Sequence, residues 1–285
     1  MLDKLIMKLL IVTTEKDKSC ERIIEEAVKR KIIVRRVFYS DMCLHRLEAK
    51  NFSKFDFCIL RDPYNTGKDF SIYLRTIMHF FKGNVLDFNT YMHYPFYEDK
   101  LFQHLLFRDV ARMPRFWHYN SNVMVDIDTF PVVVKKRIGS RGRDIFLIKN
   151  EGELRSFLSG KEVHEYLFEE RIKVRKDIRV VVLGNKVIGA VEREVRFKER
   201  AGYRGIGVKV SSRYKIQKDM KEKALIVAKR MECDFCGIDF IVDDNGKGYL
   251  LECNVSPQFT SSERVLNINI AGKLVEYIVG KIKEQ

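Results

Sequence analysis

Three oxygen-bearing side chains near the end of the chain, Asp239, Glu252 and Asn254, are spaced so that one β-hairpin would bring them together. Two apolar runs carry them, and Asn245-Gly246 between the runs is a strong signal for a two-residue hairpin turn. Pairing outward from that turn places Asp239 opposite Glu252. Because side chains alternate along a strand, Asn254 shares the face of Glu252.

This arrangement predicts a divalent cation site. Like charges directly opposite each other destabilise a hairpin, and the surrounding apolar residues predict that the two carboxylates are buried. Buried carboxylates need a counter-charge. Two carboxylates and an amide oxygen are hard ligands that suit Mg²⁺, with Mn²⁺ as the alternative ion. The competing interpretation of this segment alone is a surface hairpin whose acids bind nothing.

A second group of residues has the properties of a phosphate site. A predicted strand ends in Lys135, and a loop with Gly139, Ser140, Arg141 and Gly142 follows it. Glycines let a backbone approach a phosphate closely, and exposed N–H groups beside a fixed lysine bind anions. The spacing is not that of a P-loop. Taken alone, this segment is better explained as a β-hairpin turn with solvated arginines.

Two acids further along have the character of nucleoside ligands. Glu170 ends an apolar strand, and Asp177 follows seven residues later. A carboxylate with free backbone groups beside it can bind the edge of an adenine, and a later aspartate can accept hydrogen bonds from ribose hydroxyls. By itself this signal is weak, because acids at strand ends usually face water.

The elements that must position these residues fall into two patterns. A strand at 8–12, a helix at 19–30 and a strand at 32–38 predict a small parallel α/β unit at the start. The later strands are mostly joined as in an antiparallel α+β fold, and 267–282 is predicted to be a final helix. The expected fold class is therefore mixed α/β and α+β, with more than one unit.

Composition and charge limit the classes of protein. The chain has 285 residues, 46% hydrophobic and 32% charged, which is typical of a globular protein of one to three domains. No apolar run is long enough to span a membrane, and residues 1–5 do not resemble a signal peptide. We therefore expect the protein to be located in the cytoplasm. The net charge is +14, and residues 173–213 carry twelve basic against four acidic residues. This excess favours a local site for an anionic partner.

Six cysteines are scattered along the chain, and only Cys233 and Cys236 form a C-x-x-C. A structural zinc site needs a second pair of cysteines or histidines at short spacing, which the sequence does not offer. In a cytosolic chain these cysteines are expected to be small core residues.

Taken together, the order of these segments resembles the ATP-grasp superfamily, and within it the RimK-type carboxylate–amine ligases. The resemblance runs from about residue 97 to the end. It implies an N-terminal α/β pre-ATP-grasp domain at 1–96 and an ATP-grasp domain at 97–285, divided into a central subdomain (97–168) and a C-terminal subdomain (169–285). The matching stretches are 99–101, 131–135, 139–142, 177–179, 190–193, 237–239 and 252–257.

The resemblance also implies a role for each residue of the motifs. Phosphates of ATP would contact two lysines and the glycine-rich loop, adenine would contact three residues at a strand end, and ribose would contact an aspartate. Two arginines would lie near the reacting phosphates and the acyl group. The contacts to the phosphates would be Lys100, Lys135, Gly139, Ser140, Arg141 and Gly142. Adenine would contact Glu170, Arg171 and Ile172, ribose would contact Asp177, and the two arginines are Arg179 and Arg193. Mg²⁺ would be bound by Asp239, Glu252 and Asn254.

Members of this family phosphorylate a carboxylate with ATP, and an amine then attacks the acyl phosphate. Phosphoryl transfer needs positioning and neutralisation of negative charge, which lysines, arginines and bound Mg²⁺ supply. The chain departs from the family pattern at 198–205, which lacks the usual asparagine, and between Glu170 and Asp177, where the linker is short. The N-terminal domain matches no motif.

Two other functions remain open at this point. One is a non-catalytic ATP-binding or scaffold protein of the same fold. The other is a basic nucleic-acid-binding protein, which is disfavoured because only Phe197 and Tyr203 interleave the basic segment. Within the ligase hypothesis, the charge favours attachment of an amino acid such as glutamate to an acidic small molecule or an acidic protein tail. Association as a homodimer or homotetramer is also expected.

Overall fold

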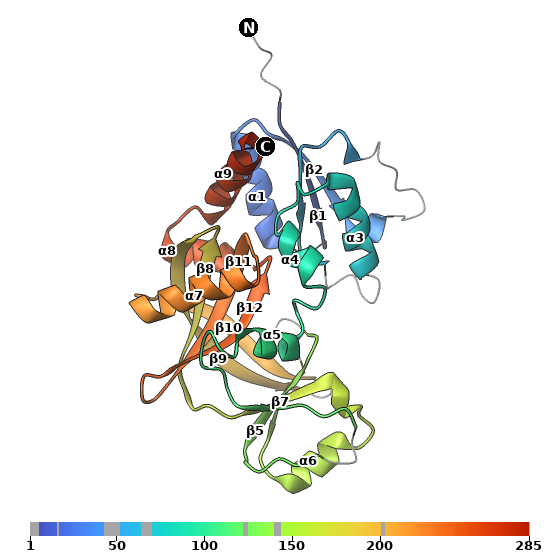
Figure 1. The fold of residues 1–285 in the computed structure, drawn as a ribbon. Helices are drawn as coiled ribbons and strands as arrows, with labels where there is room; N and C mark the ends of the chain where they lie inside the picture. The colour runs from blue at the N-terminus through green and yellow to red at the C-terminus, as the bar shows by residue number, and fades with distance from the viewer. Residues whose placement is uncertain are drawn as a thin grey trace.

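The computed structural model describes residues 6–15, 17–42, 52–63, 70–121, 125–139, 144–200 and 203–284, without the side chains of 70, 71, 73, 196–200 and 203–207. Three β-sheets organise this part of the chain. Figure 1 shows a three-stranded sheet at one end, a five-stranded sheet in the middle and a four-stranded sheet at the other end.

The N-terminal sheet is parallel, as the sequence predicted. Its strands β1 (Lys8–Thr13), β2 (Ile33–Phe38) and β3 (Phe57–Leu60) lie in the order β2-β1-β3. The central strand β1 is buried after its first residue, which is typical of a parallel strand covered on both faces. Helix α1 (Lys18–Lys29) makes the crossover between β1 and β2 and begins at Asp17, whose side chain accepts hydrogen bonds from the N–H groups of Ser19 and Cys20.

The five-stranded sheet carries most of the candidate site residues. Its strands lie in the order β10-β9-β8-β11-β12 and pair in antiparallel fashion throughout. Helix α7 (Lys218–Arg230) connects β10 to β11 and buries Met220, Ala224, Val227 and Ala228. The strands are β8 (Val174–Leu183), β9 (Lys186–Arg200), β10 (Tyr203–Arg213), β11 (Phe235–Asp243) and β12 (Gly248–Val255).

The four-stranded sheet has a hydrophobic core of its own. It is antiparallel in the order β4-β7-β5-β6, and α6 (Glu151–Leu158) packs on it through Leu154 and Phe157. Its strands are β4 (Phe116–Trp117), β5 (Val132–Lys136), β6 (Ile145–Ile148) and β7 (Tyr166–Glu170). Three helices lead from the N-terminal sheet towards it: α3 (Phe70–Phe81), α4 (Phe88–His93) and α5 (Lys100–Phe107).

By contrast, the N-terminal and five-stranded sheets share their hydrophobic cores. One cluster joins Leu10 and Leu60 to Phe240, and a second joins Ile11 to Phe235. The position of the five-stranded sheet relative to the N-terminal sheet is therefore fixed by packing on two faces. Among the described residues, no helix is both long and apolar enough for a bilayer crossing.

The final helix predicted at 267–282 is present as α9 (Ile270–Lys283), with its start a few residues later than predicted. A short helix that the sequence did not predict, α8 (Thr260–Leu266), precedes it. Asn267 ends α8 in the left-handed conformation, and the side chain of Asn269 accepts a hydrogen bond from the Gly272 N–H at 2.7 Å to begin α9. Helix α9 lies alongside α1 (Figure 1).

The hairpin of β11 and β12 confirms the predicted pairing of Asp239 with Glu252. The turn itself differs from the predicted two-residue turn, because Val242 pairs with Gly248 and Gly246 adopts a left-handed φ of 80°. A three-residue loop with glycine in this conformation is the next most common hairpin connection. A β-bulge between Asp239 and Phe240 then restores the register that the two-residue turn would have given.

Candidate functional site

Asp239 is the centre of a buried cluster of charges on the five-stranded sheet. Arg179 on β8 makes two parallel hydrogen bonds to it, from Nε to Oδ1 and from Nη2 to Oδ2, each 2.7 Å long. Arg193 on β9 donates from Nη1 to Oδ2 at 3.1 Å and also forms an ion pair with Asp177. The counter-charge that the sequence required for Asp239 is thus supplied by two arginines from neighbouring strands.

Asn254 links the two acids of the hairpin. Its Nδ2 donates to Asp239 Oδ2 and to Glu252 Oε1, both at 3.1 Å. The three predicted metal ligands therefore converge on one face of β11 and β12. Together with Asp177, Arg179 and Arg193 they form what we call the acid–arginine cluster.

Gly237 leaves the space in which Arg179 lies. A Cβ at this position would be 3.3 Å from Cδ and Nε of Arg179 and 3.1 Å from Cβ of Pro257. Gly237 is two residues before Asp239 and so faces the same side of the sheet. The glycine of the Gly237-Ile-Asp239 motif therefore has a packing role, since a side chain there would force Arg179 and Pro257 to shift by a few tenths of an ångström.

The two aspartates of the cluster have shifted pKa values of opposite sign. Burial alone would raise the pKa of Asp239, but the guanidinium groups of Arg179 and Arg193 outweigh burial and hold that pKa below its usual range. Burial raises the pKa of Asp177 to about 6, because the attraction of Arg193 is partly cancelled by the charge of Asp239. Asp239 is therefore ionised at neutral pH.

Lys135 lies in a second buried charge cluster, on the four-stranded sheet. Its Nζ is 2.5 Å from Glu169 Oε2, and His104 Nε2 is 3.0 Å from Glu169 Oε1. Burial would raise the pKa of Glu169, but Lys135 and His104 outweigh it and lower the pKa to about 2. Glu169 and His104 therefore hold the ammonium group of Lys135 in place at the strand end.

Lys100 begins α5 and contacts the start of the glycine-rich loop. Its Nζ donates to Gly139 O at 2.9 Å, and its N–H donates to Arg137 O at 3.1 Å. The predicted loop residues Ser140, Arg141 and Gly142 lie outside the described residues.

Gln103, also on α5, connects this helix to the metal-side strand. Its buried amide donates to Cys253 O at 3.0 Å and accepts from Cys253 N–H at 2.8 Å. Cys253 is the residue between Glu252 and Asn254. Helix α5, which begins with Lys100, is therefore bonded to β12 at the residue between two of the predicted metal ligands, Glu252 and Asn254.

The residues predicted to hold adenine lie at the end of β7. Glu170 is half-buried, its Oε1 accepts a hydrogen bond from Arg115 N–H at 2.8 Å, and its own N–H donates to Arg115 O at 2.8 Å. Arg171 is exposed and Ile172 half-buried in the connection to β8. Asp177, predicted to hold ribose, belongs to the acid–arginine cluster on the other sheet.

Four residues of the site were not identified from the sequence: Glu169, His104, Gln103 and Glu98. Glu169 could have been found from strand alternation, since β5 and β7 place it diagonally across from Lys135. Burial raises the pKa of Glu98 to about 8, and the nearby charge of Glu252 adds to the rise.

The C-x-x-C pair meets a third cysteine. The Sγ atoms of Cys233, Cys236 and Cys253 all lie within 4.8 Å of one another, and all three residues are buried. We call them the thiol cluster. Burial raises the pKa of the Cys233 thiol, and contact with Cys233 raises the pKa of the Cys236 thiol. Contact with Cys233 would lower the pKa of the Cys253 thiol, but contact with Cys236 and burial together outweigh it and raise that pKa, so the thiols are neutral. They lie on the face of the hairpin opposite the acid–arginine cluster.

The family model of the RimK-like ATP-grasp domain matches residues 105–278, the segment that carries the acid–arginine cluster, Lys135 and Glu170. The chain belongs to this family. The match therefore covers the last turn of α5 from residue 105, the four-stranded sheet, the five-stranded sheet and most of α9.

Curated relatives share this domain at about one third identity. Human beta-citrylglutamate synthase B is 31% identical over 170 residues, which are 56% of this chain and 43% of that protein. Human N-acetylaspartylglutamate synthase A is 33% identical over 155 residues, 52% of this chain and 38% of that protein. The probable alpha-L-glutamate ligase of Legionella pneumophila (strain Paris) is 34% identical over 160 residues, 54% of this chain and 51% of that protein. The chain thus spans about half or less of each relative's length.

Solved structures extend the similarity to the whole fold. The ATP-grasp ligase PsnB, in complex with a minimal precursor, has a TM-score of 0.70 at 17% identity and covers 96% of this chain and 99% of its own. The D-alanine–D-alanine ligase of Bacillus anthracis has a TM-score of 0.69 at 16% identity, with 98% of both chains covered. These likenesses show that the RimK-like domain and the parallel N-terminal sheet together form an ATP-grasp fold.

Proposed function

We propose that the chain is an ATP-dependent, ADP-forming carboxylate–amine ligase. In the first step a substrate carboxylate oxygen bonds to the γ-phosphorus of ATP, and the bond from that phosphorus to ADP breaks. In the second step an amine nitrogen bonds to the acyl carbon, the bond from that carbon to the phosphate oxygen breaks, and the nitrogen loses a proton. The products are an amide, ADP and inorganic phosphate.

The observation that carries this proposal is the convergence of Asp239, Glu252 and Asn254 beside Arg179 and Arg193. Membership of the RimK-like family and the names of the relatives, which are synthases and ligases, support it. One of the similar structures, PsnB, was solved with Mg and ADP.

The charges of the cluster suit a divalent cation. Asp177, Asp239 and Glu252 are three carboxylates against the two guanidinium groups of Arg179 and Arg193, which leaves one uncompensated negative charge when all are ionised. The donors are hard oxygens of the kind that Mg²⁺ prefers, with Mn²⁺ as the alternative ion. When bound, Mg²⁺ would neutralise charge on the phosphates of ATP.

The remaining residues divide between binding and charge stabilisation. We assign Lys100, Lys135 and the loop of Gly139, Ser140, Arg141 and Gly142 to the phosphates. Arg179 and Arg193 are held beside Asp239 with fixed orientation, which suits stabilisation of charge that develops on the transferring phosphoryl group. Nucleoside binding is assigned to Glu170, Arg171 and Ile172 for adenine and Asp177 for ribose.

We propose glutamate as the amino acid and an acidic molecule as its partner. The names of the relatives contain glutamate, and the basic excess of 173–213 favours an anionic substrate. A cytoplasmic location, homo-oligomers, and the division at 96/97 and 168/169 are also part of the proposal.

The test is an ADP-release screen in which glutamate and other amino acids are paired with candidate acids in the presence of Mg²⁺. The ligase should release ADP only when an acid and an amine are both present. Asp239→Asn should abolish release, whereas Asp244→Asn, an exposed acid in the same hairpin, should leave it unchanged. Full activity of Asp239→Asn would overturn the metal assignment, and tight ATP binding without ADP release in every pairing would indicate a non-catalytic ATP-binding protein.

A further inference from the structure

A buried hydrogen-bond network joins the N-terminal sheet to the chain just after the candidate metal ligands. Arg61, which follows β3, donates from Nη1 and Nη2 to Pro257 O, both at 3.1 Å. Its Nε donates to Asp17 Oδ2 at 2.8 Å. Arg61 is 1% exposed and Asp17 is 5% exposed. Pro257 lies three residues after Asn254.

The two residues after Pro257 are held by the same end of α1. Gln258 Nε2 donates to Asp17 Oδ1 at 2.9 Å, and Ser19 Oγ donates to Gln258 Oε1 at 3.0 Å. The N–H of Phe259 donates to Ser19 Oγ at 2.9 Å. We call this set of contacts the Pro257 clasp. It binds three consecutive residues, so it fixes the path of the backbone and not only one side chain.

The backbone between the ligands and the clasp is strained. Ser256 has a φ of 55°, a left-handed conformation that is unfavourable for a side-chain-bearing residue and more so before proline. Its buried Oγ has no hydrogen-bond partner among the described residues. The free-energy costs of a strained backbone and of an unpaired buried hydroxyl persist only where the surrounding structure holds the backbone firmly, and such strained positions are concentrated at functional sites.

We propose that Arg61, together with Asp17, is a positioning residue for Glu252 and Asn254 and acts on them through Pro257 and the strained Ser256. The N-terminal sheet and α1 thereby help to fix the positions of the candidate metal ligands Glu252 and Asn254. This inference rests on the proposed function. A buried ion pair is a weak source of net stability compared with apolar packing, which favours a role in fixing geometry.

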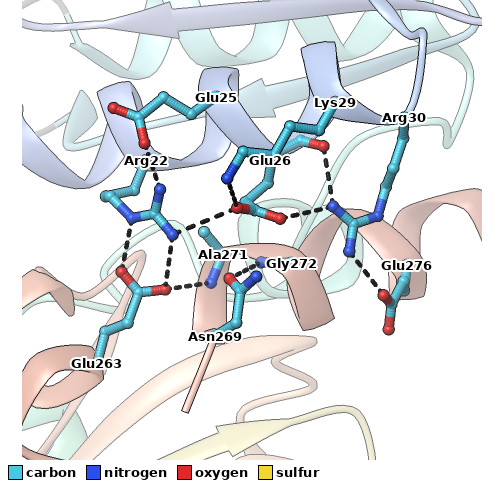
Figure 2. A network of polar contacts seen from close by, with 10 residues as sticks. All are labelled: Arg22, Glu25, Glu26, Lys29, Arg30, Glu263, Asn269, Ala271, Gly272 and Glu276. Atoms are coloured by element: carbon cyan, nitrogen blue, oxygen red, sulfur yellow. Dashed lines mark hydrogen bonds and ion pairs between the residues drawn. The ribbon is translucent and has the colours of Figure 1, made fainter. Parts of the chain in front are cut away.

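A second network between the same parts of the molecule provides the control. Arg22 on α1 donates from Nε to Glu263 Oε2 of α8 at 2.8 Å, and Arg30, directly after α1, donates from Nη2 to Glu276 Oε1 of α9 at 2.7 Å (Figure 2). Glu26 lies buried between the helices. This network also ties α1 to the carboxyl-terminal helices, but its side-chain contacts end on Glu263 and Glu276, and it reaches 252–259 only through the Glu263 N–H, which donates to Phe259 O at 2.8 Å in the first turn of α8.

The test compares Arg61→Lys with Arg22→Lys in the full-length chain. Lysine keeps a charge beside the acid but cannot make the forked contact of arginine. Arg61→Lys should raise the Mg²⁺ concentration for half-maximal ADP release about tenfold, as expected when a partner that orients a metal ligand is removed. Arg22→Lys should leave that concentration unchanged. Equal shifts in the two variants, or no shift in Arg61→Lys, would overturn the proposal.

A second measurement separates this inference from the proposed function. Amide hydrogen exchange of the peptide covering 250–259, without any ligand, should be faster in Arg61→Lys and unchanged in Arg22→Lys. If the wild-type chain releases no ADP but the exchange difference is present, the proposed function fails while the positioning contact stands. If the exchange of 250–259 is unchanged in Arg61→Lys, the positioning role fails whatever the activity.

Discussion

Replacement of Gln103 by leucine tests whether α5 and β12 are joined as the structure indicates. Gln103 is 2% exposed and makes three hydrogen bonds, to Tyr97 O at 2.6 Å and to both backbone groups of Cys253. Because β12 is an edge strand, those groups of Cys253 have no partner strand on that side in the part of the chain that the structure describes. Leucine fills a similar volume but cannot form the hydrogen bonds that the Gln103 amide makes to the Cys253 N–H, the Cys253 carbonyl and the Tyr97 carbonyl.

The expected loss follows from those unpaired groups. A buried donor or acceptor left unsatisfied costs about 1–3 kcal/mol, and carbonyls keep a second lone pair, so we expect Gln103→Leu to lower the free energy of unfolding by about 3 kcal/mol. Urea denaturation at constant m-value measures it. Gln217→Leu, at an exposed glutamine, is the control. A loss below about 0.5 kcal/mol, the usual range of surface substitutions, would refute the reasoning.

Three further predictions follow from the charge clusters and the packing. The lowered pKa of Glu169 makes the wild type lose about 3 kcal/mol of unfolding free energy as the pH falls from about 4.5 to about 2. Glu169→Gln should remove this loss, so its unfolding free energy should depend less on pH in that range. Denaturation at a series of acidic pH values measures the difference. Gly237→Ala should destabilise the protein by about 1–3 kcal/mol and reduce ADP release, because the new Cβ would crowd Arg179. An unchanged melting curve would contradict the packing role of Gly237. The thiol cluster should resist iodoacetamide at pH 8 in the native protein and react after denaturation, and rapid native labelling counted by mass spectrometry would be inconsistent with buried, neutral thiols.

The hairpin shows what a sequence can and cannot specify. Alternation and the Asn245-Gly246 signal predicted the pairing of Asp239 with Glu252, which the structure confirms. The turn was predicted with the wrong length, and the error disappeared only because a bulge beside Asp239 shifts the register back. Local turn preferences do not encode such a bulge, since it depends on how the strand packs against its neighbours.

The missed residues are those whose partners lie far away in the chain. Gln103 contacts Cys253 across 150 positions, and His104 contacts Glu169 across 65. Nothing local distinguishes either side chain from others on the buried face of an amphipathic helix. The parallel N-terminal sheet, by contrast, follows from a strand–helix–strand pattern within 8–38, and it was predicted correctly.

Strand β12 is the element on which the separate parts of the site depend. It lies at the edge of its sheet, so β11 holds it on one side only. Gln103 of α5 binds the other side at Cys253, and Arg61 binds the chain beyond its end at Pro257. Glu252 and Asn254 lie between these two contacts. Their position therefore depends both on the helix that carries Lys100 and on the N-terminal sheet, and this is how an N-terminal part without a recognisable motif would act on the site that we propose.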